Sequence, residues 1–306
     1  MYPRILEIPL PFEILGAESL TIYSFGAMMA TAFLAAAWLS RRELDRLYQA
    51  GHLSSVVMPA KKGQAKRGRK ATVNASPAHL IGTVVVIAVV GGLAGAKVFH
   101  ILEHMDEFRR DPAGMIFSKG GLTFYGGLLV AGVSIAVYVH RKGIRLITFC
   151  DALIPNVLLA YGIGRIGCHL AGDGDWGIAS NPEARPSFVP TWLWGETYPN
   201  NIVGVTLPET GVYPTSLYEF GMALVLFGTL YAVRRHPFRR GWLFSLTLLF
   251  FGVERLLIEQ IRVTNRIDIF GLTVSQAMAI SSVLILVGIV GLVRTTRRRE
   301  KPASAT

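Results

Sequence analysis

Long apolar stretches constrain this chain more than any other feature of its sequence. A helix needs roughly 20 mostly apolar residues to cross the hydrocarbon core of a bilayer. Seven stretches of this kind lie at about residues 20–39, 80–101, 121–139, 148–171, 215–233, 241–261 and 273–293. Only 17% of the 306 residues are charged, whereas soluble domains carry about 25%. We therefore predict an all-α, polytopic membrane protein with about seven transmembrane helices, and not a soluble enzyme, a coiled coil or a disordered chain.

The positive charges are distributed unevenly between the two sides of a seven-span arrangement. Of the 31 lysine and arginine residues, 21 fall on one side and seven on the other. Cytoplasmic loops carry the excess of lysine and arginine, so the pattern predicts an external N-terminus and a cytoplasmic C-terminus in a bacterial inner membrane. The net charge of +11 is mainly a topology signal, with some attraction to anionic lipids, and we expect no nucleic-acid partner.

We predict one integral membrane domain over residues 1–306 with two long loops. A basic cytoplasmic loop at about 41–79 contains the run Lys61–Lys70, whose composition is typical of a flexible, lipid-facing segment. An external loop or head region at about 172–214 holds six prolines and the pair Trp192 and Trp194. The prolines argue against a long regular helix there, and tryptophans suit a membrane interface.

Charged residues inside the predicted spans need a specific reason, because each costs at least ~2.5–3.5 kcal/mol to insert at mid-bilayer. Arg165 lies in the fourth span, and Arg255 and Glu259 lie one turn apart in the sixth. One interpretation is a structural ion pair of Arg255 with Glu259 or with Glu219. We favour the other, a phosphate or phospholipid headgroup held between helices, because arginine is suited to bidentate phosphate recognition.

Paired glycines flank the start of the third span, at 120–121 and 126–127. They allow close helix packing, which the spacing favours, or they open the backbone so that amides face a ligand.

Two further patterns carry weaker signals. His100–His104 fits H-x-x-E-H, and two histidines four residues apart could bind zinc, but the sequence shows no third protein ligand. Cys168 lies beside Arg165 and His169, which would suit an activated thiol, although a packing role is the more common one. We expect neither a metal site nor a cofactor.

Four segments together resemble the bacterial prolipoprotein diacylglyceryl transferases. They are Gly121–Gly127, Tyr161–Gly167, Tyr213–Glu219 and Glu254–Arg262. Their order, the seven spans and the external N-terminus agree with that family. The resemblance implies transfer of the diacylglyceryl group of phosphatidylglycerol to the lipobox cysteine thiol of a preprolipoprotein, with release of glycerol phosphate. This reaction is the first step of lipoprotein maturation.

The chain departs from the family pattern at several positions. Tyr125 stands where the family usually has a histidine before Gly-Gly, and Cys168 stands where an asparagine usually follows G-R-x-G. The acidic residue of the family's G-E-x-x-G element matches Asp173 or Asp175, ahead of Gly177. The chain therefore resembles a divergent member.

The resemblance also implies roles for individual residues. The catalytic set is Arg165, Arg255, Tyr125 and Glu259. The substrate-binding set is Arg165, Tyr23, Gly126, Gly127, His169, Asp173, Gly177 and Tyr218. The general base stays open between Tyr125, His169 and a water that passes the proton to Asp173 or Asp175. The implied partners are phosphatidylglycerol, a preprolipoprotein signal peptide with its lipobox cysteine, and the lipid bilayer.

Three other classes remain compatible with these residues. The first is a phospholipid-binding or translocating paralogue without transferase activity. The second is a related transferase with a different lipid donor or acceptor. The third is a secondary transporter for an organic anion, which usually shows an internal repeat that this sequence lacks.

Overall fold

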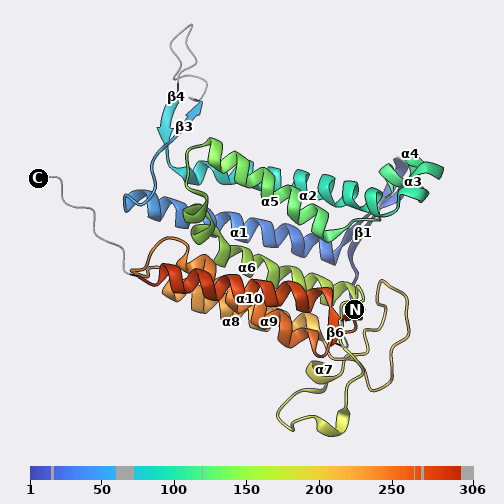
Figure 1. Cartoon of the computed structure of the whole chain (residues 1–306). Helices are drawn as coiled ribbons and strands as arrows, with labels where there is room; N and C mark the ends of the chain where they lie inside the picture. The colour runs from blue at the N-terminus through green and yellow to red at the C-terminus, as the bar shows by residue number, and fades with distance from the viewer. Residues whose placement is uncertain (15–16, 60–71, 119, 265, 270–271, 298–306) are drawn as a thin grey trace, which may run out of the picture. The chain divides into compact units, whose positions relative to one another are not determined.

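A computed structural model describes residues 1–14, 17–59, 72–118, 120–264, 266–269 and 272–297. A long helix forms at each of the seven predicted spans (Figure 1): α1 (Ser24–Gln49), α2 (Ile81–Glu103), α5 (Phe124–Arg141), α6 (Leu146–Ala171), α8 (Thr215–Val233), α9 (Trp242–Glu259) and α10 (Gln276–Thr295). The sheets in the described part of the chain are three two-stranded pairs. The all-α, polytopic class is confirmed.

The long helices differ in polarity. Within the described ranges, five are long and apolar enough to cross a membrane, judged by length and composition: Pro77–Glu103, α5, α6, α8 and α10. In contrast, α9 carries Glu254, Arg255 and Glu259, and α1 continues into Arg41 and Arg42. These two helices are the more polar members of the set.

The chain divides into two compact units, one of residues 1–36 with 153–306 and the other of residues 37–152. The first half of α1 and most of α6 belong to the larger unit. The smaller unit also contains β3 (Val56–Pro59) paired with β4 (Thr72–Ala75), the 3-10 turn η1 (Pro77–Leu80), α3 (Met105–Arg110) and α4 (Pro112–Phe117). The basic run Lys61–Lys70, predicted to be flexible, lies outside the described residues.

In the smaller unit, α2 and α5 approach each other through glycines. A Cβ atom at Gly126 would lie 2.3 Å from Cβ of Phe99, and one at Gly127 would lie 2.8 Å from the carbonyl oxygen of Gly92. A Cβ atom at Gly95 would lie 2.5 Å from the carbonyl oxygen of Gly126. Small residues let helix backbones approach this closely, which supports the packing interpretation of the second glycine pair.

In the larger unit, α6, α8 and α9 share a hydrophobic core centred on Leu158, Ala223, Leu230 and Leu243. Next to it, α9 and α10 lie side by side (Figure 1) and also approach closely, because a Cβ atom at Gly288 would lie 2.7 Å from the backbone nitrogen of Leu249. This core places one face of α6 next to residues from α8 and α9.

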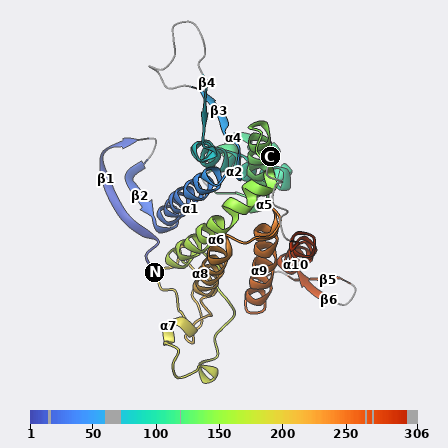
Figure 2. The same ribbon diagram turned by 90° about the vertical axis from the view of Figure 1, so that its left-hand side faces the viewer.

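Two hairpins move the starts of two predicted helices. The strands β1 (Arg4–Ile14) and β2 (Ala17–Tyr23) pair antiparallel, as do β5 (Arg266–Ile269) and β6 (Leu272–Ser275). Each hairpin leads directly into a helix (Figure 2). The helices begin at Ser24 and Gln276, a few residues after the predicted starts at about 20 and 273. The reason is that a short apolar run does not distinguish a strand from the first turn of a helix.

The segment 172–214 contains only short helical turns, η2 (Pro182–Ala184) and α7 (Thr191–Trp194). This confirms the prediction that no long helix forms there. The segment has a small core of its own, built on Trp176, Tyr198 and Val212. It is therefore packed, and it can hold individual side chains in defined positions.

Candidate functional site

Arg165 is the centre of a buried polar cluster in the larger unit. It lies on α6 and is only 8% exposed. Its guanidinium group pairs with the carboxylates of Asp175 and Glu219, and Nη1 also donates to Sγ of Cys168 at 3.5 Å. A buried charge needs such partners, because an unpaired one would be very costly.

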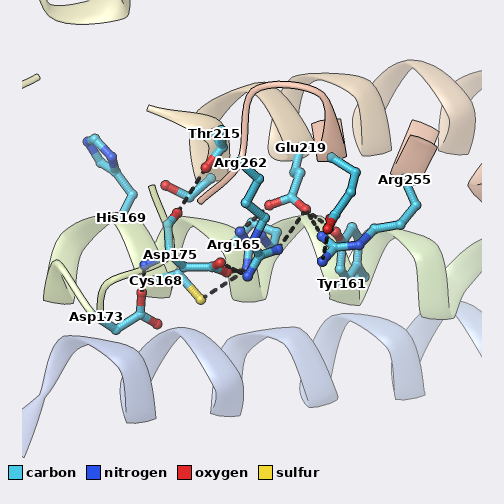
Figure 3. Close-up of polar contacts among 12 residues, drawn as sticks. Tyr161, Arg165, Cys168, His169, Asp173, Asp175, Thr215, Glu219, Arg255 and Arg262 are labelled. Atoms are coloured by element: carbon cyan, nitrogen blue, oxygen red, sulfur yellow. Dashed lines mark hydrogen bonds and ion pairs between the residues drawn. The ribbon is translucent and has the colours of Figure 1, made fainter. Parts of the chain in front are cut away.

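Glu219, on the first turns of α8, connects three helices through its carboxylate. It is fully buried, and it accepts from Nη1 of Arg255 at 2.7 Å and from the hydroxyl of Tyr161 at 2.9 Å. It also pairs with Arg165, and Arg262 reaches it at 3.8 Å. Figure 3 shows the arginine side chains converging on this group.

Asp175 brings the segment 172–214 to the same cluster. Its carboxylate pairs with both Arg165 and Arg262, so it bridges two guanidinium groups. Its backbone is held in turn, because the hydroxyl of Thr215 donates to the Asp175 carbonyl at 3.0 Å. A carboxylate between two guanidinium groups occupies the kind of position that a phosphate would take.

Arg262 lies just after the end of α9, and its pKa is affected by the charges around it. Burial and the neighbouring Arg165 cation lower the pKa of Arg262. Two cations this close favour an anion between them. In the structure Asp175 supplies that anion.

Two more carboxyl groups on α9 lie near the cluster. Glu259 is fully buried and reaches Nη2 of Arg255 at 3.6 Å. Glu254 is 3% exposed, and neither of its side-chain oxygens has a hydrogen-bond partner among the described residues. Three guanidinium groups therefore share this region with four carboxyl groups, counting Asp175 and Glu219.

The predicted pairing alternatives for Arg255 are both present, since it contacts Glu219 and Glu259. The sequence indicated Glu219 only as a possible ion-pair partner and Asp175 only as a possible proton acceptor, and it gave no individual role to Arg262 or Tyr161. Arg262 and Glu259 lie seven and four residues after Arg255 and so share its helical face, which was the available signal. No local pattern indicates that Asp175 reaches Arg165.

Arg165, Arg255 and Arg262, with the carboxylates that they share, form what we call the arginine cluster. His169 and Tyr218 have partners outside it. Figure 3 shows His169 pointing away from Arg165, and its Nδ1 lies 3.2 Å from the hydroxyl of Tyr198. Burial raises the pKa of Tyr198, so this phenol stays protonated and can donate. The hydroxyl of Tyr218 donates to the carbonyl of Leu193 at 2.6 Å. Both contacts anchor the segment 172–214.

Gly177 and Asp173 shape the same segment. A Cβ atom at Gly177 would lie 2.7 Å from the carbonyl oxygen of Ile261, so only glycine lets the loop pair with the chain after α9. The side chain of Asp173 accepts from the backbone nitrogen of Asp175 at 3.2 Å. These two residues therefore position Asp175 beside Arg262.

Tyr23 makes none of the described contacts with the arginine cluster. It is 46% exposed at the end of β2. It lines a pocket of about 410 Å³ with Pro3, Arg4, Asn200, Asn201 and Ile202.

Tyr125, Gly126 and Gly127 belong to the smaller unit. Tyr125 is 42% exposed on the first turn of α5, with its ring edge-on to Phe124. Gly126 and Gly127 are buried against α2.

The apolar helices, and the three arginines that share carboxylates between them, define the class: a polytopic membrane protein with a charged cluster between its helices. The comparisons specify the family. The family model described as prolipoprotein diacylglyceryl transferase matches residues 12–294. The chain belongs to this family.

Curated relatives are similar to this chain over most of its length. A protein of Clostridium tetani is 25% identical over 278 residues, which cover 90% of this chain and 94% of the relative. One of Bacillus cereus strain G9842 is 28% identical, covering 86% and 85%, and one of Corynebacterium efficiens is 28% identical, covering 71% and 69%. All three carry the name phosphatidylglycerol–prolipoprotein diacylglyceryl transferase.

Proposed function

We propose that this chain transfers the diacylglyceryl group of phosphatidylglycerol to the thiol of a lipobox cysteine in a preprolipoprotein signal peptide. Glycerol phosphate is the leaving product. Family membership and the names of the relatives support the reaction. The structural observation that carries the proposal is the convergence of Arg165, Arg255 and Arg262 on two shared carboxylates. Buried guanidinium groups are suited to a phosphodiester.

The setting proposed for this reaction is the bacterial inner membrane. The excess of lysine and arginine on one side of the spans supports an external N-terminus and a cytoplasmic C-terminus. Family coverage over residues 12–294 supports a single transferase domain. The segment 172–214 then faces the exterior, where a signal peptide presents its cysteine.

Phosphate binding at this site proceeds by exchange with Asp175. The guanidinium groups of Arg165 and Arg262 already hold one carboxylate, so an entering phosphodiester takes over those contacts. Asp175 is the exchangeable partner, because it lies on a loop with Gly172 and Gly174 at positive φ. Glu219 is fully buried on α8 and stays in place to orient the arginines.

The chemical step forms one bond and breaks another. The thiolate sulfur attacks the glyceryl carbon that carries the phosphate ester, the carbon–sulfur bond forms, and the carbon–oxygen bond breaks with its electron pair on the phosphate oxygen. The arginines stabilise the charge on this leaving group, as preorganised cations do in a dry site. The thiol proton must leave first, because the thiolate is the nucleophile.

Tyr125, at the sequence position of the family's histidine, is one of the proposed proton acceptors, with His169 and a water that passes the proton to Asp173 or Asp175 as the others. We expect Tyr125→Phe to lower turnover by about 10²-fold or more, the usual size of a general-base contribution, with phosphatidylglycerol binding unchanged. Peptide mass spectrometry measures turnover, and equilibrium binding of labelled lipid measures affinity. Tyr125→His is the matched control and should retain activity. Full turnover in Tyr125→Phe would remove this residue from the mechanism.

The test of the whole proposal uses purified protein, phosphatidylglycerol and a synthetic lipobox peptide. Mass spectrometry should show a diacylglyceryl increment on the peptide. The increment should disappear with Arg165→Ala, and with a peptide whose cysteine is replaced by serine. If no increment forms while lipid still binds and a known transferase is active in parallel, the chain is a lipid-binding paralogue or uses another donor or acceptor.

A further inference from the structure

A second cluster of chemically active side chains lies in the smaller unit, at the C-terminal end of α2. It consists of His100, Glu103 and His104, the residues of the H-x-x-E-H pattern. Positions i, i+3 and i+4 share one face of a helix. One potential ligand atom from each residue lies within 4.8 Å of the other two. The third ligand that the sequence did not reveal is therefore the glutamate inside the motif.

Neighbouring groups orient two of the three side chains. Nδ1 of His104 lies 3.1 Å from the carbonyl oxygen of His100, and when Nδ1 carries the proton, Nε2 is left with its lone pair for a metal ion. The hydroxyl of Thr123 donates to Oε2 of Glu103 at 2.6 Å. Metal-binding histidines and carboxylates characteristically have such outer hydrogen bonds.

The backbone next to His100 provides room for its ring. Gly121 has a φ of +68°, and a Cβ atom at this position would lie 2.3 Å from Nε2 of His100. Only glycine fits both the backbone conformation and the space beside the imidazole. Gly121 of the first glycine pair thus lies directly beside the histidine cluster.

We propose that His100, Glu103 and His104 bind a divalent transition-metal ion, with zinc as the best match. Two imidazole nitrogens and one carboxylate oxygen form a zinc ligand set that leaves a fourth position for water. The same donors also accept nickel or copper, but they suit calcium and magnesium poorly. Glu103 and His104 are exposed, so an ion can enter from solvent.

The three ligand atoms lie close to the separations that a bound zinc ion requires. Tetrahedral ligands about 2.1 Å from zinc lie about 3.4 Å from one another, so atoms within 4.8 Å must move inward by a small amount. Thr123 is the residue directly before α5, and it contacts Glu103. A bound ion would therefore hold the end of α2 against the start of α5, and this stabilisation gives a second measurable effect.

Calorimetric titration of zinc chloride into untagged, purified full-length protein tests the proposal. We expect one zinc ion per chain, with affinity at least tenfold weaker in His100→Asn, Glu103→Gln and His104→Asn. His140→Asn removes an exposed histidine from the same unit and should leave affinity unchanged. Equal binding by wild type and a His100→Asn, His104→Asn double variant would overturn the proposal, and so would an equal loss in His140→Asn.

A second pair of variants tests whether Glu103 takes part in binding or whether the two histidines bind zinc alone. Thr123→Val should weaken zinc binding about tenfold, because Glu103 loses its orienting hydrogen bond, and Thr123→Ser should restore it. Zinc should also raise the Tm of wild type and leave that of His104→Asn unchanged. If Thr123→Val binds zinc as tightly as wild type, the carboxylate is not a ligand and the three-residue site is refuted. Transferase activity enters neither measurement, so the result is independent of the proposed function.

Discussion

The pair α2–α5 and the group α6–α8–α9 both consist mainly of apolar helices, yet they pack in opposite ways. The first pair approaches through Gly92, Gly95, Gly126 and Gly127. The second group encloses guanidinium and carboxyl groups beside an ordinary hydrophobic core. Glycine contacts maximise backbone proximity, whereas buried ion pairs give little net stability and are retained for other reasons. The comparison indicates that glycine contacts hold the first pair of helices together, whereas the second group is organised around paired charges.

The largest effect is expected from Glu219. Because it is fully buried and contacts three arginines, Glu219→Ala leaves their charges short of a partner, which typically costs about 3–5 kcal/mol. Thermal unfolding in detergent should show a large fall in Tm. Glu196→Ala, which changes a glutamate in the segment 172–214, is the control. An unchanged Tm in Glu219→Ala would show that the arginine cluster is not a structural unit.

The glycine contacts between α2 and α5 predict a smaller loss of stability. Gly126→Ala places a Cβ atom 2.3 Å from that of Phe99, and overpacking of this kind costs about 1–3 kcal/mol. Gly132→Ala on the same helix is matched to it, since a Cβ atom there has no neighbour within 4 Å among the described residues. Thermal unfolding should show a lower Tm for Gly126→Ala and an unchanged Tm for Gly132→Ala. Equal Tm values for the two would contradict close packing of α2 on α5.

Glu254 predicts a gain in stability. Its buried carboxyl oxygens have no hydrogen-bond partner within the described structure, and such unsatisfied groups cost about 1–3 kcal/mol. Glu254→Leu should therefore raise the Tm, in contrast to Glu219→Ala. A drop in Tm would reveal that Glu254 stabilises the neighbouring arginines.

The smallest expected effect concerns binding. Asp175→Asn removes the carboxylate that competes for Arg165 and Arg262, so phosphatidylglycerol should bind about tenfold more tightly, a change of about 1.4 kcal/mol. Equilibrium binding of labelled lipid measures this, with Glu183→Gln, an exposed position in the same segment, as the control. Weaker binding by Asp175→Asn would mean that Asp175 positions the arginines and does not compete with the phosphate.

Much of the fold and part of the site follow from the sequence. Apolar stretches of about 20 residues predicted all seven long helices, because membrane insertion depends on local hydropathy. The helices α1 and α10 begin a few residues after the predicted starts, because the last residues of the hairpin strands before them carry no charge. Arg165 and Arg255 were recognisable because a charge in an apolar stretch needs a reason.

The sequence by itself determined the helical class, the two arginines within apolar spans and the family. Only the tertiary structure decided that Glu219 links the arginines, that Asp175 bridges Arg165 and Arg262, and that Thr123 contacts Glu103. The physical reason is that hydropathy and helical periodicity are properties of neighbouring residues. The partner of a buried charge, in contrast, is set by which helices and loops pack together, and residues 10 to 100 positions apart meet only after that packing forms.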